Sequence, residues 1–178
     1  GEATSLKKFS ESLAKKPLRF QPGTDYKYGY SIDILGRYIE AIEGKPLDVV
    51  MRDRIFDKLG MKDTEFWIRK REDLDRVALV YGKGRQNNLR AWDKSAELLL
   101  KPKRMMGGQG LVSTTSDYAK FCQMFLNKGK LGNIQILKPE TVELMSQNHL
   151  KSIGKVYGLG GFVKENGFYS WGGAAGTG

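Results

Sequence analysis

The sequence is poor in the residues that build disulfide frameworks and metal centres. Its 178 residues include one cysteine, Cys122, and one histidine, His149. A single cysteine excludes an intramolecular disulfide. One cysteine and one histidine also cannot form the spaced Cys and His motifs that bind zinc. The sequence also lacks the glycine-rich and Walker loops that bind dinucleotides and nucleotides. We therefore expect neither a metal nor an organic cofactor.

Long apolar runs and a leader segment are missing as well. The longest uninterrupted apolar run covers residues 77–81, whereas a membrane helix needs about 20 such residues. The chain begins with Gly1 and shows no charged segment followed by an apolar one. We expect this start to be a processed end or the end of a fragment, which leaves the compartment open.

What the sequence does contain is enough apolar material for one domain. Apolar residues make up 40% of the chain and charged residues 28%, which is typical of a folded domain with its own core. The net charge is +10, but dense basic clusters occur only at residues 69–71 and 101–104. No RNP motif, zinc finger or basic zipper accompanies them. We expect a solvated basic surface and no nucleic-acid site, and an unrelated basic binding protein remains a competing hypothesis.

Helical periodicity and capping signals predict five helices, over residues 4–16, 31–43, 46–58, 114–129 and 139–145. In the second, Ser31 is the expected N-cap, Gly44 the end, and Leu35, Ile39 and Ile42 the inner stripe. In the fourth, Thr114 and Asp117 resemble a capping box. Its expected buried face consists of Tyr118, Phe121, Cys122, Phe125 and Leu126, and Cys122 is expected to be an inert core thiol.

Strand signals are weaker and lie mostly late in the chain. Short strands are expected at residues 65–68 and 77–81, with a polar loop at 82–88. Residues 156–163 and 168–171 flank Asn166 and Gly167, a pair typical of hairpin turns. Helices first and strands last predict an α+β fold with an antiparallel sheet. We expect a single partial domain over residues 1–178, with a helical region at about 1–105 and a helix plus strands at about 106–178.

Several catalytic classes find little support. A Ser-His-Asp triad would have to use His149, and no Gly-x-Ser-x-Gly elbow is present. Residues 107–110, Gly-Gly-Gln-Gly, could cradle a phosphate or form a tight turn that leads into the helix at Thr114. Nucleophilic catalysis by a serine with a base other than histidine remains.

Four segments together resemble the serine β-lactamase-related family, which groups class C β-lactamases, D,D-peptidases and family VIII esterases. They are residues 22–36 (PGTDYKYGYSIDILG), 55–64, 107–118 and 171–176. Their order and spacing are specific although no single segment is. The resemblance implies a β-lactamase/transpeptidase-like fold, of which we expect the nucleophile segment at the N-terminal side and the last strands to be missing.

The resemblance places a catalytic tyrosine at Tyr28. In the family, a Ser-x-x-Lys pair supplies the nucleophile and a tyrosine helps to move its proton. Tyrosine is a useful base only beside positive charge, because its ordinary pKa is about 10. The alternative for Tyr28 is a buried aromatic residue before a helix. Tyr30 stands where class C enzymes have asparagine, and it either lines the pocket or packs.

The last of these segments implies the substrate-binding strand. Trp171, Gly172 and Gly173 replace the Lys-Thr-Gly of lactamases, as in esterase-like members. The missing cation weakens the case for β-lactam hydrolysis and leaves esters and amides. By the same match, the backbone N–H of Ala174 donates to the oxyanion. The alternative for the two glycines is a bend in an edge strand.

Three Ser-x-x-Lys matches occur, at Ser5, Ser12 and Ser152, and none is expected to be the nucleophile. We therefore expect a fragment of a serine hydrolase that acts through an acyl-enzyme on small esters, amides or β-lactams, and that is inactive alone. The alternative is a non-catalytic module with the same fold. Oligomeric state is left open.

Overall fold

The first helices form where the sequence places caps. In the computed structural model, which describes residues 5–83, 88–92, 95–164 and 168–173, α1 spans Leu6–Ala14 and α2 spans Ser31–Glu43. The side chain of Ser5 caps α1 by accepting a hydrogen bond from the N–H of Lys8. Gly44 ends α2 as predicted, but Tyr30 and not Ser31 is its N-cap. Ser31 is wrong as the cap because the backbone is already helical there.

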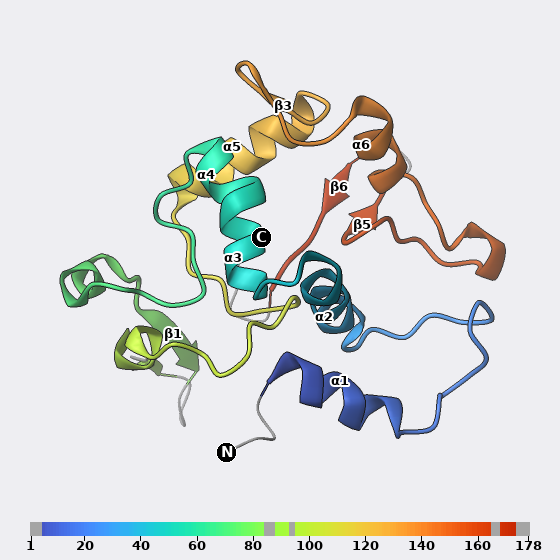
Figure 1. The fold of residues 1–178 in the computed structure, drawn as a ribbon, viewed down its shortest axis with the longest axis horizontal. Helices are drawn as coiled ribbons and strands as arrows, with labels where there is room; N and C mark the ends of the chain where they lie inside the picture. The colour runs from blue at the N-terminus through green and yellow to red at the C-terminus, as the bar shows by residue number, and fades with distance from the viewer. Residues whose placement is uncertain (1–4, 84–87, 93–94, 165–167, 174–178) are drawn as a thin grey trace.

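The third predicted helix is continuous but changes its helix type along its length. It comprises α3 (Leu47–Met51), a π-helical turn (Arg52–Phe56) and α4 (Asp57–Leu59). Helix α2 packs between α1 and α3 (Figure 1). A Cβ atom on Gly36 of α2 would lie 2.9 Å from the Leu47 side chain and 3.5 Å from that of Leu6. Glycine at this position therefore allows the close approach of the three helices.

Two buried clusters form the core. The first lies between α3 and the segments around Phe66 and Met105, and the second joins α4 to α5 (Thr115–Leu126). Met51 packs against both. The first cluster consists of Leu47, Phe66, Trp67 and Met105, and the second of Phe56, Leu59, Met61 and Met124.

Parts of the predicted helical faces are exposed. Leu35 and Ile42 of α2 are 49% and 65% exposed, and only Ile39 packs against the core. On α5, Cys122 and Tyr118 are exposed and Leu126 is 81% exposed. These predictions were wrong because the covered sides of both helices are narrower than the apolar stripes. The fully buried residue of α5 is Met124, one position outside the predicted face.

The strands are short and form three separate antiparallel pairs within the described residues. They are β1 (Val80–Lys83) with β2 (Leu89–Trp92), β3 (Lys130–Leu131) with β4 (Ile134–Gln135), and β5 (Phe162–Val163) with β6 (Tyr169–Ser170). The predicted strand at residues 65–68 is reduced to a single bridge between Glu65 and Val112. Phe66, Trp67 and Ile68 are all buried there, so the segment does not alternate as a strand would.

The structure confirms the antiparallel pairing of the last two predicted strands, but both strands are shorter than predicted. The predicted strand at residues 156–163 shrinks to β5, because the N–H of Gly158 bonds to the carbonyl of Gly161 and turns the chain. Asn166 and Gly167, the predicted turn, lie outside the described residues. Helix α6 (Pro139–Met145) agrees with its prediction. None of the helices in the described ranges is long and apolar enough to span a membrane.

Candidate functional site

Tyr28 and Trp171, which are far apart in the sequence, meet in an aromatic cluster. Their ring centroids lie 5.5 Å apart. The Trp171 ring also stacks on Phe162 of β5 at 5.3 Å and meets the edge of Tyr157 at 5.8 Å. Tyr28 is 62% exposed and Trp171 is 38% exposed. Tyr28 is thus not a buried core residue, and its ring is accessible at the edge of the cluster.

Tyr157 lies at the centre of this cluster. Its ring also contacts Tyr26 at 5.1 Å and Phe162 at 5.4 Å. Burial raises the pKa of Tyr157 to about 12, and the neighbouring Tyr26 adds to the rise. The phenol of Tyr157 therefore stays protonated at neutral pH and can donate a hydrogen bond, but it is unsuited to act as a base.

A lysine joins the loop of Tyr28 to the segment of Tyr157. The ammonium group of Lys155 donates hydrogen bonds to the carboxylate of Asp25 and, at 3.1 Å, to the carbonyl oxygen of Tyr26. The hydrogen bond from Lys155 lowers the pKa of Asp25, and the N–H of Tyr26 lowers it further. Figure 1 shows the loop between α1 and α2 passing beside the segment that follows α6.

The other residues of the predicted site are placed as follows. Tyr30 packs its ring on Phe9 of α1, with centroids 5.2 Å apart, so it faces α1. Gly172 and Gly173 are exposed and continue from Trp171 beyond β6. Ala174, the predicted oxyanion donor, lies outside the described residues.

The structure gives the residues of the Ser-x-x-Lys matches other contacts or leaves them exposed. The Ser5 hydroxyl caps α1, and Ser12 is exposed on the same helix. Lys155, the lysine of the third match, is bound to Asp25 and Tyr26, while Ser152 is exposed. None of these three serines lies in the aromatic cluster.

The glycine-rich segment at residues 107–110 forms a turn packed against the start of α2. The buried carboxylate of Asp33 accepts the N–H of Gly108 at 2.8 Å. A Cβ atom on Gly107 would lie 2.3 Å from the carbonyl oxygen of Ile32. Because the Asp33 carboxylate already accepts an N–H of this segment, the geometry favours the tight turn over a phosphate cradle.

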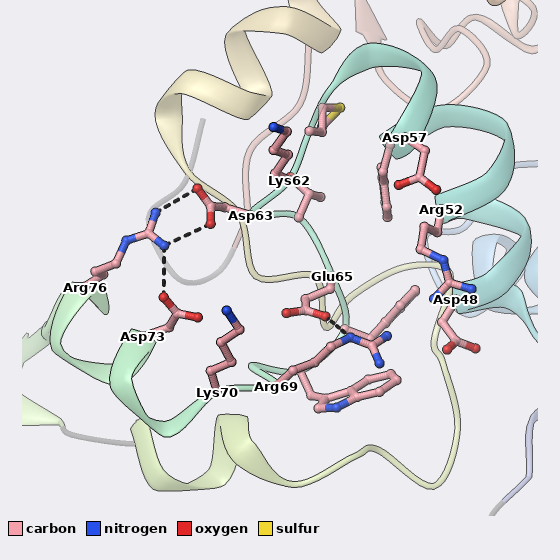
Figure 2. A pocket seen from close by; sticks show the side chains of 15 residues that line it. Asp48, Arg52, Asp57, Lys62, Asp63, Glu65, Arg69, Lys70, Asp73 and Arg76 are labelled. Carbon is pink, nitrogen blue, oxygen red and sulfur yellow. Dashed lines mark hydrogen bonds and ion pairs between the residues drawn. The ribbon is translucent and has the colours of Figure 1, made fainter.

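A cavity formed by other described residues lies away from this cluster. Its volume is about 460 Å³, and Figure 2 shows charged side chains around it. Arg76 binds Asp63 through two hydrogen bonds of 2.7 and 2.9 Å and Asp73 at 3.2 Å, and Arg69 binds Glu65 at 2.6 Å. These mutual ion pairs make the cavity a salt-bridged surface groove without Tyr28 or Trp171. The aromatic cluster brings together two of the segments that carry the family resemblance, and it is therefore the candidate site.

Metal and histidine chemistry gain no support from the geometry. Within the described ranges, no three His, Cys, Asp or Glu side chains are arranged to hold a metal ion. The Nε2 atom of His149 lies 2.7 Å from the carbonyl oxygen of Leu144, and its backbone N–H bonds to the carbonyl of Tyr157. His149 thus has a structural role beside α6.

Sequence reasoning missed Lys155 and Tyr157 as parts of this region. The only signal for Lys155 was its place in a Ser-x-x-Lys match, which pointed to a nucleophile pair. Tyr157 stood in an expected strand. Both contacts join residues that are distant in the sequence, so only the fold could reveal them.

Comparison with known proteins identifies relatives of this chain. A family model described as Beta-lactamase matches residues 1–178. Lovastatin esterase of Penicillium rubens is 37% identical over 151 residues, covering 79% of this chain and 35% of the esterase. Protein Rv1367c of Mycobacterium tuberculosis is 34% identical over 139 residues, covering 78% of this chain and 34% of that protein. The chain thus spans about a third of the length of these relatives.

The fold agrees with solved structures. The structure of EstCE1, a hydrolase with promiscuous acyltransferase activity, matches with a TM-score of 0.75 at 24% identity. The match covers 95% of this chain and 46% of that one. This likeness shows a β-lactamase/transpeptidase-like fold, which the motifs had predicted.

Proposed function

The chain belongs to the Beta-lactamase family, and from this premise we propose that it is the tyrosine-bearing part of a serine hydrolase that cleaves small esters through an acyl-enzyme. The observation that carries this proposal is the contact between Tyr28 and Trp171, with ring centroids 5.5 Å apart. It brings the tyrosine motif beside the segment in which an oxyanion donor is expected at Ala174.

In the proposed reaction, the serine is supplied by a segment outside this chain. Its Oγ atom attacks the ester carbonyl carbon while its proton passes toward the Tyr28 oxygen. The ester C–O bond then breaks, and the leaving alcohol takes this proton. Water then cleaves the acyl-enzyme and releases the acid. A tyrosine oxygen can take part because its exposed position allows a cationic group of the nucleophile segment to approach it.

Esters are favoured over β-lactams by the residues beside Tyr28. The position at which lactamases carry a lysine is occupied by Trp171, whose ring contacts Tyr28, Tyr157 and Phe162. Among the described residues, this surface consists of uncharged rings, and the neighbouring cation of Lys155 is already bound to Asp25 and Tyr26. An esterase relative at 37% identity agrees with this preference.

The test uses the longer protein that contains this chain. We expect a fluorophosphonate to add once to the protein, as seen by intact mass, and we expect Tyr28→Phe to lower kcat for p-nitrophenyl butyrate about 10²- to 10⁴-fold, the range for losing a positioned acid–base group. Tyr38→Phe is the matched control, because Tyr38 is a tyrosine of similar exposure, 61%, on α2.

Two results would contradict the proposal. A protein that takes no adduct and turns over no ester would be the non-catalytic module. Equal kcat values for Tyr28→Phe and Tyr38→Phe would remove Tyr28 from the mechanism.

A further inference from the structure

We propose that Lys155 is a positioning residue for Tyr28 and that Asp25 is its partner. This inference rests on the proposed function, because it assigns the residues that hold the proposed catalytic tyrosine in place. Lys155 binds the carboxylate of Asp25 and the carbonyl oxygen of Tyr26. Lys155 therefore binds Tyr26 and Asp25, which lie two and three residues before Tyr28.

The loop that carries Tyr28 has little regular structure of its own. Between α1 and α2, its backbone makes an internal hydrogen bond from the N–H of Thr24 to the carbonyl of Gln21. The Asp25 carboxylate also accepts the N–H of Tyr26. These bonds shape the loop, but they do not fix it against the rest of the molecule. The contacts of Tyr26 with Lys155 and Tyr157 do so, together with the ring contacts of Tyr28 with Trp171 and of Tyr30 with Phe9.

The segment on the other side of these contacts is well braced. The side-chain oxygen of Asn148 accepts the N–H groups of Leu150 and Tyr157, and its amide nitrogen donates to the carbonyl of Lys155. The N–H of Lys155 bonds to the carbonyl of Leu150. Hydrogen bonds thus hold the backbone of Lys155 in place, and its ammonium group connects this segment to Asp25.

A positioning role follows from the geometry. Tyr28 is 62% exposed, so its contact with Trp171 restrains the ring less than full burial would. Losing the Lys155 bonds would free the preceding residues. Displacing a reacting group by about 1 Å can cost about 100-fold in rate, so a modest shift of the loop would be measurable.

The experiment compares four variants in the longer, active protein. For Lys155→Met we expect kcat for p-nitrophenyl butyrate to fall about 10- to 100-fold, with KM changed by less than about threefold, since the loss affects the transition state more than substrate binding. Lys155→Arg should recover most of the rate, because it restores a cation with several donors. The kcat of Asp25→Asn should lie between those of Lys155→Met and Lys155→Arg, since the hydrogen bond from Lys155 to the Tyr26 carbonyl remains.

Lys151→Met is the matched control. Lys151 lies on the same segment and is exposed, and its removal lowers the net charge by the same amount. We expect its kcat and KM to match those of the wild type. An equal loss in Lys151→Met and Lys155→Met would overturn the proposal, because it would show a general effect of charge or stability. If Lys155→Met does not fold, the kcat of Asp25→Asn is compared with that of Lys151→Met instead, and equal values would overturn the proposal.

A spectroscopic readout separates positioning from mere stability. With 5-fluorotryptophan incorporated, the ¹⁹F resonance of Trp171, assigned through Trp171→Phe, should shift in Lys155→Met and stay unchanged in Lys151→Met. An unchanged resonance together with a wild-type kcat would overturn the positioning role alone. A wild-type protein without acyl-enzyme formation would overturn the proposed function, and the role of Lys155 with it.

Discussion

Asp117 accepts three hydrogen bonds while it is almost fully buried. They come from the N–H of Asp63 at 2.7 Å, the hydroxyl of Thr64 at 3.1 Å and the ammonium group of Lys120 at 2.8 Å. Burial by itself would raise the pKa of Asp117, but the hydrogen bonds, chiefly that from Lys120, outweigh it and hold the pKa below its ordinary value. A single carboxylate thus fixes the start of α5 to the segment after α4.

Replacing this carboxylate should destabilise the fold. We expect Asp117→Asn to lower the free energy of unfolding by about 3 kcal/mol, because an amide cannot accept all three donors and leaves Lys120 without its carboxylate partner. Asp53→Asn, which removes an exposed partner of Lys45, should cost less than about 1 kcal/mol. Urea unfolding of both variants measures the difference, and equal losses would contradict the role of Asp117.

The same residue predicts a pH dependence. Its pKa is lower in the folded chain than the ordinary value of 3.8, so its contribution is fully present above that value. The contribution is lost as the pH falls through the lowered pKa of the folded state. We expect the stability gap between wild type and Asp117→Asn to shrink on acidification below pH 3.8. A gap that stays constant would contradict the assignment.

At this scale the sequence predicted caps better than contacts. Thr114 was predicted as a cap and does accept the N–H of Asp117 at 3.2 Å. The carboxylate of Asp117, expected to complete a capping box, instead binds Asp63 and Thr64. A cap depends on residues three positions apart, whereas these bonds join residues more than fifty positions apart. Only the tertiary structure determines such partners.

At the scale of elements, Gly129 forms the joint between α5 and the β3–β4 hairpin. Its N–H bonds to the carbonyl of Met124, and its carbonyl accepts the N–H groups of Ile136 and Leu137. Its φ of +90° is unfavourable for other residues, and a Cβ atom would lie 2.1 Å from the carbonyl oxygen of Leu137. Glycine is therefore required here for both conformation and space.

A pair of substitutions separates these two requirements. Gly132→Ala in the β3–β4 turn should cost about 1 kcal/mol, because its φ is +56° but its surroundings are open. Gly129→Ala should cost about 3 kcal/mol or more, because the backbone oxygen of Leu137 must also move. Thermal and urea unfolding measure both. Equal losses would show that the close approach contributes nothing.

Elements were predictable where a local signal sets them. Helix α2 covers the predicted residues and ends at Gly44 as expected, although Tyr30 and not Ser31 is its N-cap. Helix α5 ends at Leu126 with Asn127 as its C-cap, so the predicted end at Gly129 is wrong. The π-helical turn at Arg52–Phe56 and the β3–β4 hairpin were not predicted. Both depend on how the flanking residues pack, since Phe56 and Leu131 contact the same buried cluster. For the site, the motifs predicted Tyr28 and Trp171, while their contact and its support by Lys155 required the fold.

At the scale of the whole molecule, large apolar side chains remain uncovered. On α5, Leu126 and Tyr118 are 81% and 52% exposed, and Cys122 lies between them on the exposed side. On α2, Tyr38 and Ile42 are also more than half exposed. Exposed apolar side chains gathered on one side of a helix, as on α5, commonly mark a contact with another segment or another molecule. The net charge of +10 opposes association between copies but does not remove this surface.

We expect the 178-residue chain alone to self-associate through the α5 face. Leu126→Lys should reduce the association, because it places a charge in the apolar surface. Gln123→Lys is the matched control, since it adds the same charge at an exposed polar position of α5. Sedimentation velocity over about a hundredfold range of concentration measures both variants. A wild-type chain that stays monomeric would contradict the prediction, and equal association of the two variants would place the contact on another face, such as that of α2.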